Sequence, residues 1–224
     1  MTLRLFHSPA SPYVRKVMVT AIERGVEDRI ELLPSAAGPV RRDQTIVRHN
    51  PSGKVPSALL ENDQPLFDSR VICAYVDSLA ASSASVYPQD QRRFKVLMLE
   101  ALADSILDAC LLCRYERVMR PAELQWDDWY NGQMEKIDSG LDDLENRWFD
   151  DIAVEFHAGS IAAACTLGYL DFRFGDKDWR LSHPKLAAWF AEVSGRPSME
   201  KTFPKADPQK RRPRKWGLLC IVQR

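Results

Sequence analysis

The sequence Leu-Arg-Leu-Phe-His-Ser-Pro-Ala-Ser-Pro-Tyr-Val at residues 3–14 runs from a strand through a tight loop into a helix. Leu3 and Leu5 alternate with polar neighbours, which is the period-2 pattern of a strand, and Pro9 interrupts that pattern. Ser11 followed by Pro12 is typical of a helix start, with a side-chain oxygen at the N-cap and proline at the first helical position. A hydroxyl at this place can cap the helix and can also face an anion such as a thiolate.

The segments that follow continue an alternation of strands and helices. The first helix is expected from Pro12 to about Gly25, and residues 29–33 form a second short strand, which predicts a parallel βαβ unit. A weakly helical piece at 41–49, a strand at 54–60, a turn at 61–64, a return strand from Pro65 and a helix beginning at Asp68 come next. The inner face of that last helix is expected to carry Val71, Ile72, Tyr75, Val76 and Leu79. This order predicts a thioredoxin-like α/β domain over residues 1–80.

The rest of the chain predicts a second, all-α domain. Residues 81–90 have the small and polar composition of a linker, and residues 91–203 are expected to form a helical bundle. Its long first helix, at 92–120, is expected to bury Phe94, and a second helix follows at 122–149. Residues 160–172 are apolar or small nearly all round, which places that helix at the bundle centre. Residues 204–224, with a basic run at 210–215 and an apolar segment at 218–222, are expected to form a disordered tail.

Composition favours a cytoplasmic globular protein. Basic and acidic residues number 31 each, so no overall charge favours nucleic acid or an anionic membrane, and no apolar run is long enough to span a bilayer. Five cysteines at no regular spacing indicate free thiols in a reducing compartment. Cys110 and Cys113 form a Cys-x-x-Cys pair inside an apolar helix, which favours two buried thiols over a redox or zinc site, and no metal is expected.

Four motifs, in this order and at these separations, resemble those of the cytosolic glutathione transferases, most closely the bacterial serine-type members. They are residues 8–17, 50–56, 68–70 and 164–172, and the resemblance covers residues 1 to about 203. It implies the glutathione transferase fold, in which a glutathione-binding thioredoxin-like domain precedes an all-helical substrate domain. It also implies a cytosolic, homodimeric detoxification enzyme that uses glutathione as co-substrate.

The resemblance assigns glutathione-binding roles to five residues. Pro56 is cis in the family, which leaves the backbone of Val55 free to pair with the cysteinyl part of glutathione. Asp68 and Ser69 suit the γ-glutamyl ammonium and carboxylate, and Lys54 suits the glycine carboxylate. The alternatives are that Pro56 only starts a strand, that Asp68 and Ser69 only cap a helix, and that Lys54 is a solvated surface residue.

The resemblance places the catalytic hydroxyl at Ser11, with Ser8 as the second candidate. Ser11 stands where the first cysteine of a glutaredoxin-like Cys-Pro-Tyr-Cys motif would be, and Val14 replaces the second, which excludes disulfide exchange through this site. A hydroxyl that donates to the glutathione sulfur favours the nucleophilic thiolate. A capping role alone is the alternative for Ser11.

The resulting prediction is a glutathione S-transferase that acts on a small electrophile. The alternatives are a non-catalytic glutathione-fold binding or regulatory protein, and a glutathione-dependent isomerase or dehalogenase. The electrophile pocket is expected near Arg114 and Tyr115 and along the face from Trp126 to Tyr130, and the sequence does not name the electrophile.

The central helix of the second domain departs from the family pattern at its start. The family has a capping box there, whereas this chain has His157 and Ser160. A weakened cap, costing about 1 kcal/mol, is therefore expected.

Overall fold

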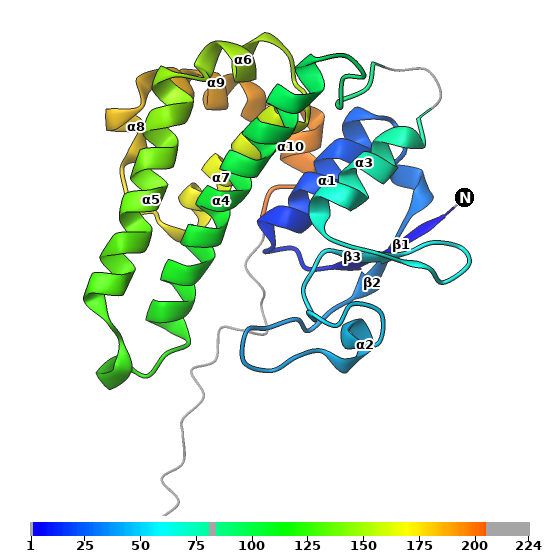
Figure 1. The fold of residues 1–224 in the computed structure, drawn as a ribbon, viewed down its shortest axis with the longest axis horizontal. Helices are drawn as coiled ribbons and strands as arrows, with labels where there is room; N and C mark the ends of the chain where they lie inside the picture. Colours follow the sequence, from blue (N-terminus) through cyan, green and yellow to red (C-terminus); the bar gives the residue numbers. More distant parts are fainter. Residues whose placement is uncertain (1, 81–83, 205–224) are drawn as a thin grey trace, which may run out of the picture.

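The computed structural model describes residues 2–80 and 84–204, which form a small mixed sheet with helices followed by a helical bundle (Figure 1). This arrangement confirms the predicted fold class. The first part contains β1 (Leu3–His7), α1 (Pro12–Glu23), η1 (Glu27–Arg29), β2 (Ile30–Pro34), α2 (Gln44–Val47), β3 (Ser57–Leu59), β4 (Pro65–Leu66) and α3 (Ser69–Ser78). The second contains α4 (Arg92–Val118), η2 (Ala122–Leu124), α5 (Asp127–Asn146), α6 (Phe149–Val154), α7 (Ala158–Arg173), α8 (Trp179–Ser182), α9 (Pro184–Ser194) and α10 (Pro197–Lys201).

The four strands are arranged in the order β2-β1-β3-β4. β1 and β2 are parallel, as the βαβ pattern predicts, while β3 is antiparallel to both β1 and β4. α1 and α3 pack against each other and join the main core, and α2 buries Ile46 in a separate small cluster with Phe6 and Leu59. The sheet is therefore covered by α1 and α3 on one face and by α2 on the other (Figure 1).

α7 lies at the centre of the helical part and also contacts the first part. Every residue from Ala158 to Leu170 is buried, as the apolar pattern predicts, and the helix packs against α4, α6, α9 and α1. One contiguous cluster of buried side chains thus runs from Leu5 in the sheet to Leu167 in α7. Among the described residues, no helix is long and apolar enough to cross a membrane.

Some local predictions were wrong. Val71 is 47% exposed and Phe94 is 76% exposed, although both were expected in the core. The helix expected from residue 122 begins at Asp127, because residues 122–124 form the short turn η2 and the side-chain amide of Gln125 donates to the carbonyls of Arg117 and Arg120.

Parts of the expected linker are packed. Residues 84–90 carry Val86 and Tyr87, both buried, and the Tyr87 hydroxyl donates to Glu100. Residues 81–83 and the expected tail after Pro204 lie outside the described residues.

The N-cap of α7 takes a form the sequence did not suggest, and the Ser160 hydroxyl donates to the Glu155 carbonyl instead of completing a capping box. His157 is the N-cap residue, and its Nδ1 accepts a hydrogen bond from the Ser160 amide at 3.2 Å. Its Nε2 lies 3.0 Å from the carbonyl of Asp151, so the neutral tautomer with the proton on Nε2 satisfies both contacts. The imidazole therefore replaces the hydroxyl of a usual capping residue.

The cysteines of the described part are buried free thiols. These are Cys73, Cys110, Cys113 and Cys165, while Cys220 lies outside that part. Burial raises the pKa of Cys113 to about 11 and also raises the pKa of Cys110, which disfavours the reactive thiolate. The Cys-x-x-Cys pair on α4 is therefore structural, as its sequence context indicates.

Candidate functional site

The strand register brings the predicted site segments to one end of the sheet. Phe6, next to the end of β1, pairs with Ser57 at the start of β3, so the loop after β1 lies beside Pro56. Ala58 pairs with Leu66 at the end of β4, so the start of α3 follows at the same end. The loop before α1, the turn before β3 and the N-terminus of α3 thus meet, although they are up to about 60 residues apart in the chain.

Ser8 and Ser11 lie together in the first of these segments. The Ser11 amide donates to the Ser8 carbonyl at 3.0 Å, and the Ser11 hydroxyl accepts from the Val14 amide at 3.3 Å as the N-cap of α1. A hydroxyl that accepts in this way keeps its own proton for donation to a ligand. The Ser8 hydroxyl makes no hydrogen bond with any described residue.

The second segment offers unpaired backbone groups. The Val55–Pro56 peptide bond is cis, and Val55 is half-buried with no hydrogen bond from its backbone N–H or C=O to any described residue. Lys54 precedes it and is exposed. Such a free backbone edge can pair with an extended peptide.

The third segment is the N-terminus of α3. Asp68 is exposed and caps the helix by accepting from the Arg70 amide at 3.0 Å, while Ser69 is only 3% exposed. A helix start leaves backbone N–H groups without intrahelical partners, and these favour an anionic group. The Phe67–Asp68 peptide bond is also cis.

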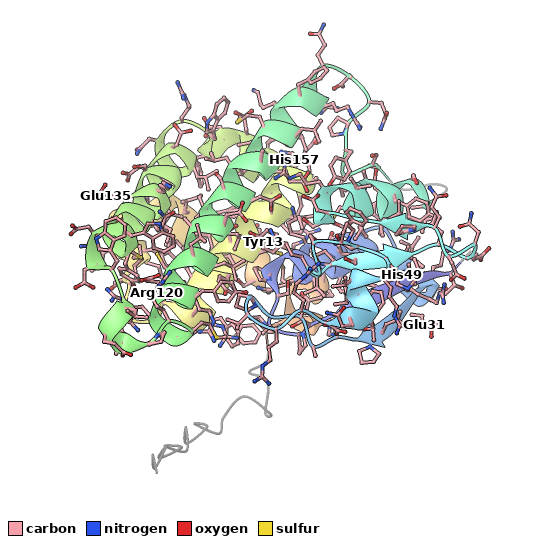
Figure 2. The ribbon with its side chains drawn as sticks, turned by 60° about the horizontal axis from the view of Figure 1, so that its bottom comes forward. Tyr13, Glu31, His49, Arg120, Glu135 and His157 are labelled. Atoms are coloured by element: carbon pink, nitrogen blue, oxygen red, sulfur yellow. The ribbon has the colours of Figure 1, made fainter. Side chains whose placement is uncertain are left out.

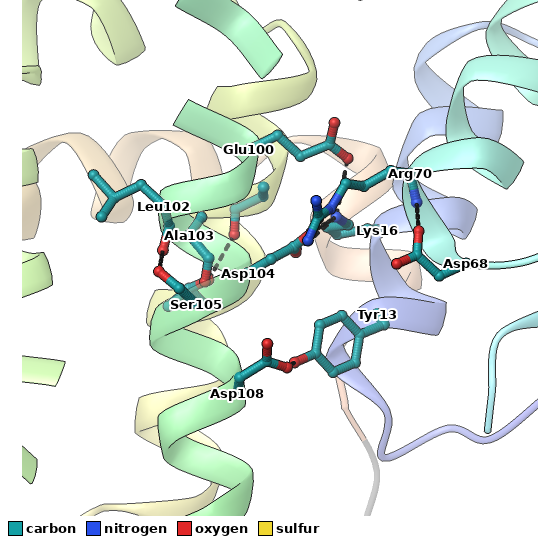
Figure 3. A network of polar contacts seen from close by, with 12 residues as sticks. Tyr13, Lys16, Asp68, Arg70, Glu100, Leu102, Ala103, Asp104, Ser105 and Asp108 are labelled. Atoms are coloured by element: carbon teal, nitrogen blue, oxygen red, sulfur yellow. Dashed lines mark hydrogen bonds and ion pairs between the residues drawn. The ribbon is translucent and has the colours of Figure 1, made fainter. Parts of the chain in front are cut away.

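A buried ionic network, which the sequence reading missed, lies behind this N-terminus (Figure 3). The Lys16 ammonium on α1 lies 3.0 Å from Glu100 and 2.7 Å from Asp104 on α4. The Arg70 guanidinium on α3 lies 2.9 Å from the same Asp104 carboxylate, and Tyr87 donates to Glu100. The network therefore ties both helices that frame the site to the helical domain.

Lys16 keeps its charge although it is buried. Burial by itself lowers the pKa of Lys16, but the charges of Asp104 and Glu100 outweigh it and leave that pKa above its ordinary value. For Glu100, burial is the largest influence, and the pKa of its carboxyl is raised despite Lys16. A sequence signal existed, because Glu100 and Asp104 are one turn apart among the apolar residues of α4 and Lys16 lies among the apolar residues of α1.

A second link between the two parts joins Tyr13 to Asp108. The Tyr13 hydroxyl donates to the Asp108 carboxylate on α4, and Tyr13 lies where the sheet domain meets the bundle (Figure 2). Burial and this carboxylate raise the pKa of Tyr13. Tyr13 is therefore fixed as a neutral phenol whose proton is committed to Asp108.

The expected electrophile region matches the structure only in part. A cavity of about 340 Å³ is lined by Arg114 on α4 and Tyr130 on α5, which were both expected there. Tyr115 and Trp126 are not among its lining residues, and Trp126 is 62% exposed with its amide donating to Glu116.

Comparisons with known proteins give the same family for both parts of the chain. Residues 10–79 match the family model described as the glutathione S-transferase N-terminal domain, and residues 127–192 match the glutathione S-transferase C-terminal domain. A relative from Escherichia coli K12, the uncharacterized GST-like protein YibF, is 33% identical over 205 residues, which cover 90% of this chain and 98% of that protein.

Two solved structures of a glutathione transferase family member from Pseudomonas fluorescens Pf-5 are also similar. The one with bound glutathione is 46% identical, with a TM-score of 0.89, and covers 92% of this chain and 100% of that one. The one with bound S-(propanoic acid)-glutathione is 45% identical, with a TM-score of 0.85, and covers 91% of this chain and 100% of that one.

Proposed function

Because this chain belongs to the glutathione S-transferase family, we propose that it binds glutathione at the end of its sheet and transfers the thiolate to a small electrophile. The observation that carries the proposal is the strand register, which gathers a helix-capping hydroxyl, a free backbone edge and a second helix N-terminus. The relatives that hold glutathione and an S-substituted glutathione support glutathione as the co-substrate.

Each segment has a role that its chemistry supports. The backbone N–H and C=O of Val55 pair with the cysteinyl residue of glutathione. Ser69 and the free N–H groups of α3 receive the γ-glutamyl carboxylate, and Asp68 receives its ammonium. Lys54, exposed beside the same edge, receives the glycine carboxylate.

The chemical step needs a thiolate, which forms when the glutathione thiol releases its proton to solvent and which Ser11 stabilises by donating a hydrogen bond from its hydroxyl to the sulfur. This bond, together with the positive end of α1, stabilises the anion relative to a thiol whose free pKa is about 8.5. The sulfur electron pair then forms a bond to the electrophilic carbon, and the leaving group departs with its bonding electrons. Ser8 is the second candidate for the same donation.

Calorimetry with glutathione tests the binding site. Wild type is expected to bind, and Ser69→Ala is expected to bind more weakly, while Ser78→Ala, an exposed serine at the other end of α3, is expected to bind as wild type does. A chromogenic aryl halide then tests transfer. No binding at millimolar glutathione would overturn the transferase and favour a non-catalytic scaffold.

We also propose a homodimer in the cytoplasm. Val71 on α3 and Phe94 on α4 expose apolar side chains that a second copy would cover, and the buried free thiols suit a reducing compartment. Phe94→Glu is expected to shift the mass measured by light scattering from dimer towards monomer, whereas Lys95→Glu beside it is expected to shift it less. An unchanged mass in Phe94→Glu would contradict this interface.

A further inference from the structure

The cavity in the helical domain combines a basic lining with apolar walls. It lies between α4, α5 and the C-terminal end of α7, and its volume is about 340 Å³. Arg114, Arg117, Arg173 and Lys177 line it, against a single acidic lining residue, Asp176. Apolar side chains of Val118, Met134 and Phe174 complete the walls.

Two of the four cations are already neutralised. Arg117 lies 2.8 Å from Asp127 and stacks over the Tyr130 ring, and Lys177 forms an ion pair with Asp138. Arg114 and Arg173 form no ion pair with any residue in the described part of the chain. One net positive charge therefore remains after Asp176 is counted.

Arg173 is held in a costly position. Its Nε atom is buried with no hydrogen-bond partner among the described residues, and its guanidinium packs over the Phe172 ring at 3.8 Å. Burial and the nearby charge of Arg114 lower its pKa, while Tyr169 acts in the opposite direction. A buried donor without a partner is costly. Arg114 and Arg173 both line the cavity without an ion pair among the described residues, and two such cations on one cavity point to an anion.

The cavity lies further along α4 than Asp108, the residue of α4 that contacts Tyr13 of α1. Asp108 contacts Tyr13 near the start of α1, and Arg114 follows Asp108 by six residues on α4, which is about 9 Å along the helix axis. The cavity therefore lies on the helix that contacts the start of α1, further towards the C-terminal end of that helix.

We propose that Arg114 and Arg173 bind the carboxylate of the electrophilic substrate, so that the substrate class is an apolar or aromatic electrophile with an anionic group at its far end. This inference rests on the proposed function. A guanidinium pair suits a carboxylate because its paired N–H donors match the two oxygens, and Val118, Met134 and Phe174 receive the apolar body.

Calorimetry with matched S-substituted glutathiones tests the proposal. The probes are S-benzylglutathione and S-(4′-carboxybiphenylmethyl)glutathione, with S-(biphenylmethyl)glutathione as the neutral compound of equal length. The carboxylated probe is expected to bind about 10-fold more tightly than its neutral match, which is a typical gain for a charged hydrogen-bonded pair. Arg114→Gln and Arg173→Gln are each expected to abolish that difference, which is measured within each variant between the two long probes. Lys95→Gln, on the same helix near its other end, is expected to keep it.

Each other outcome has a distinct meaning. The inference would be overturned if wild type bound the two long probes equally, or if the difference between them survived in both arginine variants. Neither result would contradict the proposed transferase function. If Arg173→Gln were less stable but kept the difference between the two long probes, Arg173 would have only a structural role, that of stabilising the C-terminal end of α7. That result would overturn its part in the inference. No binding of S-benzylglutathione would overturn the proposed function, and this inference with it.

Discussion

The Lys16 ammonium lies 2.7 Å from the Asp104 carboxylate, and both side chains are almost completely buried. This ion pair joins α1 of the sheet domain to α4 of the bundle, and Glu100 and Arg70 extend it (Figure 3). The position of Ser11, the N-cap residue of α1 five residues before Lys16, therefore depends on a contact between the domains.

We predict that Lys16→Met lowers the free energy of unfolding by about 3–5 kcal/mol, because it leaves two buried carboxylates with only Arg70 as a counter-charge. Urea unfolding at pH 7 measures this. Lys95→Met, which removes an exposed ion pair with Asp151, is expected to cost about 1 kcal/mol or less. Similar small losses in both variants would contradict the role given to the network.

The sheet domain could be predicted from the sequence because the residues that indicate its strands, turns and helix starts are neighbours in the chain. The Ser11-Pro12 start of α1, the proline before β3 and the turn at 61–64 each depend on neighbouring residues. The ionic network could not be read in the same way, since Lys16 meets Asp104 across 88 residues. Buried charges on two apolar helices suggest partners, but only the packing of α1 on the bundle pairs them.

What the sequence did not reveal has a separate physical cause at each position. Val71 and Phe94 fit the apolar periodicity of their helices, yet periodicity does not tell which face meets the protein. The imidazole cap of His157 was not anticipated, because capping preferences favour hydroxyl and carboxamide side chains, whereas a neutral imidazole also offers an acceptor. Arg173 gave no sequence signal, because its burial arises where three helices meet.

We predict that Ser11→Gly lowers turnover with an aryl halide about 10- to 100-fold, because the donor to the sulfur is lost. Glycine at an N-cap costs only a few tenths of a kcal/mol, so the helix survives. Ultraviolet absorbance of the thiolate should show the pKa of bound glutathione rising towards its free value, with glutathione affinity changed less than turnover. Ser11→Thr, which keeps a hydroxyl, is the control. The same loss in Ser8→Ala with normal activity in Ser11→Gly would transfer the role to Ser8.

We predict that stability falls with pH below about 6.5 partly through His157. Burial lowers the pKa of its imidazole in the folded chain, against opposing contributions from Asp151 and Glu155. The unfolded chain therefore takes up a proton at a higher pH than the folded chain does. The contribution of His157 to the free energy of unfolding is complete above its pKa in the unfolded chain. It is lost as the pH falls towards its pKa in the folded chain, by at most about 1.4 kcal/mol per pH unit.

His157→Asn isolates this effect, since asparagine keeps a capping acceptor but does not titrate. Urea unfolding between pH 5 and pH 8 is expected to give a shallower decline for the variant than for wild type. Parallel curves would show that protonation of His157 is not linked to folding.

Two glycines on α5 lead to opposite predictions for the same substitution. A Cβ on Gly140 would lie 2.5 Å from Ile106 of α4, where the two helices pack, whereas a Cβ on Gly132 would meet no atom within 4 Å. Gly140→Ala is therefore expected to lower the free energy of unfolding by about 1–3 kcal/mol through overpacking. Gly132→Ala is expected to raise it by about 0.5–1 kcal/mol, because alanine favours the helix. Thermal and urea unfolding of the two variants measure both signs, and a gain in Gly140→Ala would mean that α4 and α5 pack less closely at Ile106 than the structure shows.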